Sequence, residues 1–175
     1  TTSTVSWRKN MGNLNFGPPQ TIFTPTNYNW WISHAEDFDL DGKTDLVVGK
    51  QDSLFIYRNT LPAGFSVVSK YKLPNNVTAL PGARDVNGDG RLDLVFNDGG
   101  TGSYYINVYA YLSLGNLQFS PAKKMATKIP SVFDLVDFDG DADLDFVFGS
   151  MQQSNDVMPE IQYRENYGNE LFGPV

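Results

Sequence analysis

Hydrophobic residues in this chain fall into short runs of four to seven residues, separated by polar turns that contain Gly, Asn and Pro. Runs of this length are typical of β-strands, and no segment keeps the 3.6-residue period of an amphipathic helix for a convincing length. One kind of run leads into an acidic loop, a second leaves it, and a third carries an aromatic residue. Runs of the first kind are 31–35, 80–83 and 132–136, and runs of the second kind are 46–49, 92–96 and 144–148. Runs of the third kind are 54–57, 106–112 and 160–163. The pattern predicts an all-β protein.

The acidic loops form an internal repeat. They begin at Asp37, Asp85 and Asp137, so successive loops are 48 and 52 residues apart. A second element, an aromatic residue followed by a turn and a Phe, recurs with a similar period. Its phenylalanines are 49, 54 and 53 residues apart: Phe16, Phe65, Phe119 and Phe172. A period of about 50 residues with several short strands in each unit is typical of a β-propeller.

The repeat also predicts how the chain is divided. Four antiparallel strands fit each unit, which gives about 3.5 repeats: a half-blade at 1–26 and blades at 27–74, 75–126 and 127–175. Both ends carry the same half of the unit, so the N-terminal half-blade cannot complete the C-terminal blade. A closed ring needs about four blades or more. We therefore expect that one chain alone does not close the ring. It is either a fragment of a longer propeller or completes its ring with another chain.

Each acidic loop follows the pattern D-x-[DN]-x-D-x-x-x-D. The pattern offers side-chain oxygens at positions 1, 3, 5 and 9 and a backbone carbonyl at position 7, which suits the hard cation Ca²⁺. Zinc and copper prefer His or Cys, and the chain has one His and no Cys. Mg²⁺ usually takes fewer carboxylates. Gly42 and Gly90 occupy position 6, where a sharp turn favours positive φ. Ala142 stands there in the third loop, and we expect it to weaken or distort that site.

An EF-hand begins with a similar acidic pattern but does not fit these loops. It requires a bidentate Glu at position 12 and helices on both sides of the loop. Position 12 is Val48, Phe96 or Phe148 here, and the flanking runs are strand-like. The loops are therefore interpreted as strand-to-strand turns around a cation.

Composition and charge narrow the function classes. The chain has 175 residues and a formal net charge of -7, which argues against nucleic acid as a partner. No apolar stretch is long enough to span a membrane. The acidic loops hold 12 of the 20 Asp and Glu residues. Most of the negative charge is thus explained by metal ligation rather than by a surface for a basic partner.

These residues resemble the FG-GAP (VCBS-type) repeats of integrin α-subunit propellers and many secreted propellers. The resemblance rests on the three acidic loops and on the Phe-Gly-Pro turns at 16–18 and 172–174, and it covers nearly the whole chain. It implies three Ca²⁺ sites between the first and second strands of the blades. The implied side-chain ligands are Asp37, Asp39, Asp41, Asp45, Asp85, Asn87, Asp89, Asp93, Asp137, Asp139, Asp141 and Asp145, with backbone carbonyls from Lys43, Arg91 and Asp143.

In such propellers, ligands usually meet the face opposite the metal loops. The loops expected there contain Tyr28, Trp30 and Tyr104, whose aromatic side chains suit sugar stacking or protein contact. Packing between blades is the alternative for such aromatic residues. Asn76 begins an N-x-T sequon and is a candidate glycosylation site.

The leading hypothesis is a non-catalytic extracellular Ca²⁺-binding module for protein or carbohydrate binding, adhesion, or self-assembly through unpaired blade edges. We expect a secreted protein, because weak Ca²⁺ sites of the extracellular type fill only near millimolar Ca²⁺. The alternative is part of a secreted polysaccharide lyase or hydrolase. His34, Glu36, Asp134 and Asp156 are the acids and base left for catalysis, and they form no recognisable constellation.

Overall fold

The computed structural model describes residues 4–24, 30–50, 52–74, 77–98, 105–130, 133–149 and 161–167. Within these ranges the chain forms strands and turns, with no helix, so the predicted all-β class is confirmed. Accordingly, none of the described segments is a helix that could cross a membrane. The strands are β1 (Val5–Trp7), β2 (Asn10–Gly12), β3 (Asn15–Phe16), β4 (Gln20–Phe23), β5 (Trp30–Glu36), β6 (Asp45–Lys50), β7 (Ser53–Asn59), β8 (Phe65–Lys72), β9 (Val77–Arg84), β10 (Asp93–Asp98), β11 (Tyr105–Tyr111), β12 (Ser113–Gly115), β13 (Gln118–Phe119), β14 (Lys123–Pro130), β15 (Phe133–Val136), β16 (Asp145–Gly149) and β17 (Ile161–Arg164).

The strands form antiparallel sheets that follow one another along the chain. The first blade is the four-stranded sheet β5-β6-β7-β8, and the second blade is the four-stranded sheet β9-β10-β11-β14. The third blade has the described strands β15-β16-β17, and β1 pairs with β4 in the half-blade. Two small hairpins, β2-β3 and β12-β13, lie between the paired strands of the half-blade and of the second blade. The predicted four-stranded antiparallel blades are thus confirmed in the two complete sheets.

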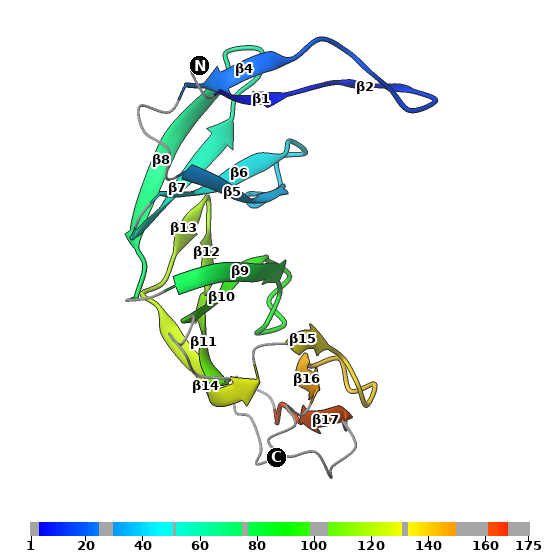
Figure 1. Ribbon diagram of the computed structural model, residues 1–175, viewed down its shortest axis with the longest axis vertical. Helices are drawn as coiled ribbons and strands as arrows, with labels where there is room; N and C mark the ends of the chain where they lie inside the picture. The colour runs from blue at the N-terminus through cyan, green and yellow to red at the C-terminus, as the bar shows by residue number, and fades with distance from the viewer. Residues whose placement is uncertain are drawn as a thin grey trace, which may run out of the picture.

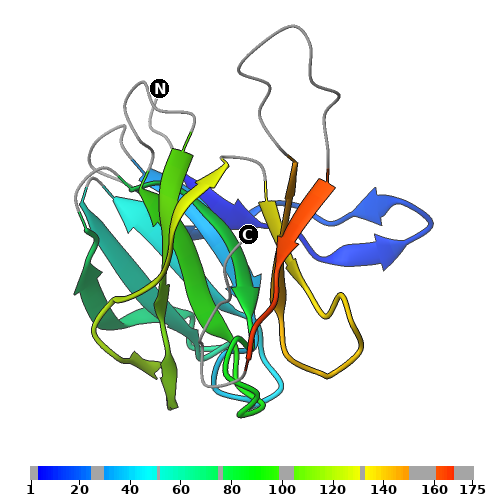
Figure 2. The same cartoon turned by 90° about the horizontal axis from the view of Figure 1, so that it is seen from below.

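The half-blade and the three blades lie one after another along an open arc, with the half-blade at one end and the third blade at the other (Figure 1). The turn between the first and second strands of each blade is an acidic loop. Seen from below, these three loops lie at the same side of the arc (Figure 2). The described part of the chain therefore has the arrangement of propeller blades without forming a closed ring.

Each junction between neighbouring units has its own hydrophobic core. The second strand of a blade is apolar along its length because its two faces meet neighbours on both sides, so its side chains do not alternate between apolar and polar. In β6 and β10 the first five residues are buried. The junction of the half-blade with the first blade includes Phe23 and Tyr57, whose rings stack at 5.0 Å. The other two junctions are built around Phe38, Leu54, Phe96 and Leu117, and around Val95, Val108 and Phe146.

Candidate metal centre

The first aspartate of each acidic loop holds the turn together. The two carboxylate oxygens of Asp37 accept the backbone N–H groups of Asp41 at 3.1 Å and Gly42 at 2.8 Å. In the second loop, Asp85 accepts the N–H groups at the same two positions, at 3.1 and 2.7 Å. These bonds curl the chain back over its own start. In the first loop this turn brings the carboxylates of Asp37 and Asp39 close to Asp45.

The third loop reaches a similar turn with one donor at a different position. Asp137 accepts the N–H groups of Gly140 at 2.7 Å and Ala142 at 3.2 Å. Ala142 has a φ of 76°, close to the 84° of Gly42 and the 82° of Gly90. A non-glycine residue in this left-handed region costs roughly 1–2 kcal/mol. Ala142 therefore adopts the conformation of the glycine that it replaces, at a cost in backbone strain.

A second strained position lies in the first loop, and sequence reasoning missed it. Leu40, at position 4, has a φ of 60°, and its counterparts Gly88 and Gly140 have φ values of 73° and 86°. Each acidic loop thus needs two left-handed residues. Only the second loop has glycine at both. The glycines at position 4 of the sister loops were the signal that could have identified Leu40.

The last aspartate of each loop begins the second strand of its blade and is fully buried. It accepts the backbone N–H of a residue that follows or ends the third strand: Asn59 to Asp45 at 2.9 Å, Ser113 to Asp93 at 2.7 Å and Asn166 to Asp145 at 2.8 Å. The side-chain amides of Asn59 and Asn166 also donate to the carbonyl of the residue before the aspartate, at 3.0 and 3.2 Å. Sequence reasoning missed that these asparagines fasten the third strand to the acidic loop.

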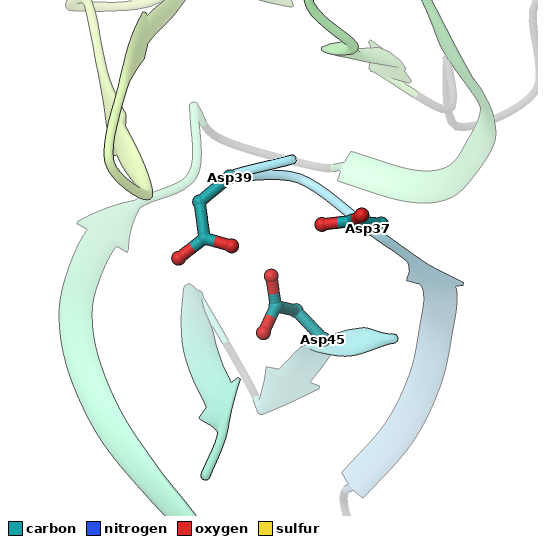
Figure 3. A group of neighbouring side chains, drawn as sticks. All are labelled: Asp37, Asp39 and Asp45. Atoms are coloured by element: carbon teal, nitrogen blue, oxygen red, sulfur yellow. The ribbon is translucent and has the colours of Figure 1, made fainter. Parts of the chain in front are cut away.

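The first loop brings three carboxylates together. The ligand atoms of Asp37, Asp39 and Asp45 all lie within 4.8 Å of one another. Figure 3 shows the three side chains around one shared space. Asp39 Oδ1 and Asp45 Oδ2 are buried and have no hydrogen-bond partner among the described residues. Buried oxygens without a partner are costly, and neighbouring carboxylates repel one another. The donor set therefore fits a hard, oxygen-liganded cation, which would satisfy both atoms.

Other side chains define the edge of this first site. Arg58 Nη2 lies 2.9 Å from Asp39 Oδ2, so it pairs with the oxygen opposite the unpartnered Oδ1. Asp41, which the sequence also predicted as a ligand, is exposed and is not part of this group. Its Oδ1 accepts the N–H of Lys43 at 2.9 Å, and its Oδ2 lies 3.8 Å from Lys43 Nζ. The structure thus gathers three of the four predicted side-chain ligands.

In the second loop, a basic side chain of the loop itself pairs with one of the carboxylates. Arg91 Nη2 donates to Asp89 Oδ2 at 2.5 Å, and Asn87 Nδ2 donates to the same oxygen at 3.1 Å. Arg91 Nε also donates to the carbonyl of Ser113 at 3.2 Å. Asp85, Asp89 and Asp93 are not among the acidic groups that converge in the described part of the chain. Arg91, predicted to offer its carbonyl, thus places its guanidinium against one of the predicted ligands.

The third loop gathers carboxylates despite Ala142. The ligand atoms of Asp137, Asp139 and Asp141 lie within 4.8 Å of one another, and all three residues are exposed. The N–H of Asp143 donates to Asp141 Oδ1 at 2.9 Å, which orients that carboxylate. This loop therefore also offers a donor set of the kind that hard cations bind.

Burial changes the pKa of the aspartates that end the first two loops. It raises the pKa of Asp93 to about 6, although the N–H groups of Ser113 and Val86 act in the opposite direction. Burial also raises the pKa of Asp45, and the charges of Asp39 and Asp41 add to that effect. Keeping these carboxylates ionised without a cation thus costs free energy.

Most of the residues predicted for the ligand-binding face lie outside the residues that the structure describes. Tyr28, Tyr104 and Asn76 lie outside the described residues, and Trp30 begins β5 without a described side chain. Their roles stay predictions.

The acids and base considered for catalysis are spread over different strands. His34 and Glu36 lie on β5 in the first blade, and Asp134 lies on β15 in the third. Asp134 lines a shallow pocket with residues of the second blade, among them Gly82 and Arg84. Asp156 lies outside the described residues.

Comparison with known proteins gives a family and a structural neighbour. The family model described as "FG-GAP-like repeat" matches residues 37–96 and 85–148. No curated protein matches the chain. Among solved structures, the chain is similar to a lectin from Agrocybe aegerita, described by its specific recognition of non-reducing terminal N-acetylglucosamine. The TM-score is 0.64 and the identity 17%, over 99% of this chain and 46% of the lectin chain.

The family match and the structural neighbour agree with the strands and acidic loops described above. The likeness to the lectin shows the fold, and this chain spans about half the length of that chain. The repeat matches begin at Asp37 and Asp85 and together run through all three acidic loops. The resemblance stated from the sequence is therefore confirmed, and the chain belongs to the FG-GAP-like repeat family.

Proposed function

We propose that this chain is a non-catalytic, Ca²⁺-binding propeller module that acts outside the cell by binding a glycan or a protein. The observation that carries the proposal is the pair of buried, unpartnered oxygens on Asp39 and Asp45, which face Asp37 in the first loop. Protein interiors rarely leave such oxygens without a partner. In an FG-GAP-like repeat, a loop of oxygen ligands is best explained by Ca²⁺.

Three Ca²⁺ sites are proposed, and they differ in how closely their ligands are already gathered. In the first loop, Asp37, Asp39 and Asp45 already converge, and in the third loop so do the three exposed aspartates at 137, 139 and 141. In the second loop the ligands would be Asp85, Asn87, Asp89 and Asp93. Arg91 must first leave the Asp89 carboxylate there. We therefore expect the second site to be the weakest.

The proposed role of the ion is structural. Asp45 begins β6 and accepts the N–H of Asn59 at the end of β7. A cation shared by Asp37, Asp39 and Asp45 would join the turn after β5 to both of those strands. Binding to the folded state alone stabilises that state. The acidic loops would then brace the blades rather than contact the ligand.

The ligand class is proposed from the family and from the lectin neighbour. The neighbour's described recognition of N-acetylglucosamine belongs to that protein, and at 17% identity the likeness shows the fold alone. It supports the proposal only in that a protein of similar fold is described as recognising a sugar. For this chain we propose that Tyr28, Trp30 and Tyr104 contribute on the face opposite the acidic loops, as a glycan-binding or adhesion surface. Secretion, and glycosylation at Asn76, are part of the same proposal.

An immobilised glycan and protein-ligand array tests this function. The chain should be retained on a subset of ligands in about 1 mM Ca²⁺, the extracellular range. Retention should be lost in chelator and regained when Ca²⁺ is restored. Tyr104→Ala should reduce retention, and Val67→Ala, an exposed change on β8, should not. Cleavage of the arrayed polysaccharides that disappears in Asp134→Asn would contradict the proposal and favour the lyase or hydrolase alternative.

A further inference from the structure

Two hairpins in this protein share one sequence pattern and one backbone conformation. The segments 12–16 and 115–119 read G-N-L-N-F and G-N-L-Q-F. The Asn and Leu of each hairpin have φ values of 50° and 60°, and the Gly before them has a φ of 88° or 80°. Left-handed Asn and Leu side by side are uncommon. The hairpins β2-β3 and β12-β13 are therefore the same structural element in two units of the repeat.

The hairpin β12-β13 packs against the preceding blade. Leu117 is fully buried and Phe119 is 5% exposed, both in the core shared by the first and second blades. The ring of Phe119 meets Phe38 of the first acidic loop edge-on, at 6.2 Å between centroids. The carbonyl of Leu117 accepts the hydroxyl of Ser69 at 2.8 Å, and the N–H of Phe119 donates to the hydroxyl of Tyr71 at 2.8 Å. In this unit, the hairpin is the part that covers its neighbour.

The hairpin β2-β3 carries the same side chains and covers nothing in the described part of the chain. Leu14 is 93% exposed and Phe16 is 58% exposed, whereas their counterparts are buried. Figure 1 shows this hairpin extending from the half-blade, away from the other sheets and along the direction of the arc. Met11 is 64% exposed, but its counterpart Leu114 is also 65% exposed. Only Leu14 and Phe16 therefore occupy positions that face a neighbour in the second blade.

The third blade has the matching exposed surface. The strand pairs Val47–Ile56 and Gly49–Leu54 in the first blade correspond to Val147–Tyr163 and Gly149–Ile161 in the third. In the first blade, Phe38, Leu54 and Ile56 are buried under the second blade. Their counterparts Phe138, Ile161 and Tyr163 are 55%, 80% and 44% exposed.

Charge complements this apolar match. Arg8 and Lys9 lie just before the hairpin β2-β3 and are exposed. The third acidic loop, which contains Phe138, carries aspartates at every second position from Asp137 to Asp145, so it stays negatively charged when one Ca²⁺ is bound. Opposite charges around an apolar contact favour encounter in the matching orientation.

We propose that a second copy of this chain docks its hairpin β2-β3 onto the surface formed by Phe138, Ile161 and Tyr163. Both halves of the contact lie on one chain, and each corresponds to one half of a contact that the chain makes within itself. A head-to-tail contact of this kind closes into a ring when the rotation allows. The lectin chain that this fold matches is about twice as long, so two copies supply a comparable length.

Sedimentation equilibrium of the full chain in Ca²⁺ tests the proposal. We expect a mass of twice 19.5 kDa, which falls to 19.5 kDa on dilution. Leu14→Asp and Phe16→Asp should each raise the dissociation constant at least about 30-fold. Met11→Asp is the matched control, because its counterpart faces solvent, and it should leave the mass unchanged. Leu14 is almost fully exposed, so its replacement should leave the melting temperature of the monomer unchanged.

Crosslinking checks the geometry separately. The chain has no cysteine, so introduced thiols are unique. Phe16→Cys combined with Phe138→Cys should give an intermolecular product with a short thiol crosslinker, and Met11→Cys with Phe138→Cys should not. A monomer at every concentration overturns the proposal, as does an assembly that survives Leu14→Asp and Phe16→Asp. Neither result affects the proposed Ca²⁺ sites, whose loss is read from thermal unfolding instead.

Discussion

The first and second acidic loops have nearly the same sequence pattern and the same turn, yet their carboxylates are arranged differently. In both, the first aspartate accepts two backbone N–H groups and the last one is buried against the third strand. In the first loop three carboxylates converge and two oxygens have no partner in the described structure. In the second loop position 3 is Asn87 rather than an aspartate, and a guanidinium pairs with Asp89, the counterpart of Asp41.

The loops differ in the residue at position 3, Asp39 or Asn87, and in how a basic side chain pairs with their carboxylates. Arg58 approaches the first loop from β7 and takes only one oxygen of Asp39. Arg91 belongs to the second loop itself and reaches Asp89 from two residues away. Lys43 is at the position of Arg91 in the first loop, but its ammonium stays 3.8 Å from Asp41. The second loop, which has glycine at both left-handed positions, is therefore the loop in which a basic side chain competes most directly with a cation for a carboxylate.

The largest effect should come from Asp45→Ala. This change removes a fully buried acceptor, leaves the N–H of Asn59 unpaired and deletes a ligand of the first site. We expect a loss of about 2–4 kcal/mol in the free energy of unfolding, measured by urea denaturation in Ca²⁺. Asp41→Ala, at an exposed residue of the same loop, should cost less than about 1 kcal/mol. Equal losses would mean that the loop does not depend on its converging carboxylates.

The second loop should make the Ca²⁺-free protein more stable in mild acid. Burial raises the pKa of Asp93 to about 6 in the folded state. The folded state then binds a proton more tightly than the unfolded state, so this contribution is fully present below the unfolded pKa of about 3.9 and is lost as the pH rises through 6. In EDTA, unfolding at pH 5 should need on the order of 1–3 kcal/mol more than at pH 7.5.

Two variants isolate this pH effect. Asp93→Asn should reduce the difference between the two pH values, and Asp134→Asn, at an exposed residue of the third blade, should keep it. A pH dependence that is unchanged in Asp93→Asn would assign the effect to other carboxylates.

Arg91→Gln should make the second loop more accessible to a cation. Without the guanidinium, the Asp89 carboxylate becomes available, and we expect Ca²⁺ affinity at that site to rise about 10-fold, as charge neutralisation is removed. Isothermal titration calorimetry measures the change. Lys43→Gln is the matched substitution in the first loop and should alter affinity less than about 2-fold, since its ammonium makes only a long contact. A weaker second site in Arg91→Gln would show that the arginine assists binding.

The smallest effects concern the strained residues that distinguish the loops. Leu40→Gly and Ala142→Gly replace residues with φ values of 60° and 76° by the residue found in the sister loops. Both are exposed, so little packing is lost. Each should raise the free energy of unfolding by about 0.5–1 kcal/mol. Gly42→Ala should lower it by a similar amount. Destabilisation by both glycine variants would indicate that the loops tolerate these residues without strain.

Much of the fold was predictable because the repeat can be recognised from the sequence. Three acidic loops and four phenylalanine turns at a period of about 50 residues gave the blades, the four-stranded sheets and the open ring. The loops also identified Asp37, Asp39 and Asp45 as neighbours. The spacing placed these carboxylates in one short turn, but it did not decide which of them converge, because the same spacing gathers Asp137, Asp139 and Asp141 in the third loop.

Features that depend on contacts between distant segments were not predictable. The competition by Arg91 depends on the rotamer of one long side chain. The different fates of Leu14 and Leu117 depend on whether a neighbouring blade is present, although their local sequences are nearly the same. The left-handed conformation of Leu40 was predictable in principle, because both sister loops have a glycine at the same position, Gly88 and Gly140.

Thermal unfolding of the wild-type chain in Ca²⁺ and in EDTA, at neutral pH and fixed protein concentration, tests the central claim most directly. If a cation occupies the space between Asp37, Asp39 and Asp45, chelation should lower the melting temperature by at least about 5 °C, and excess Ca²⁺ should restore it. In Asp39→Ala the shift should be clearly smaller, because the first site is lost. The same melting temperature in Ca²⁺ and in EDTA would contradict the account.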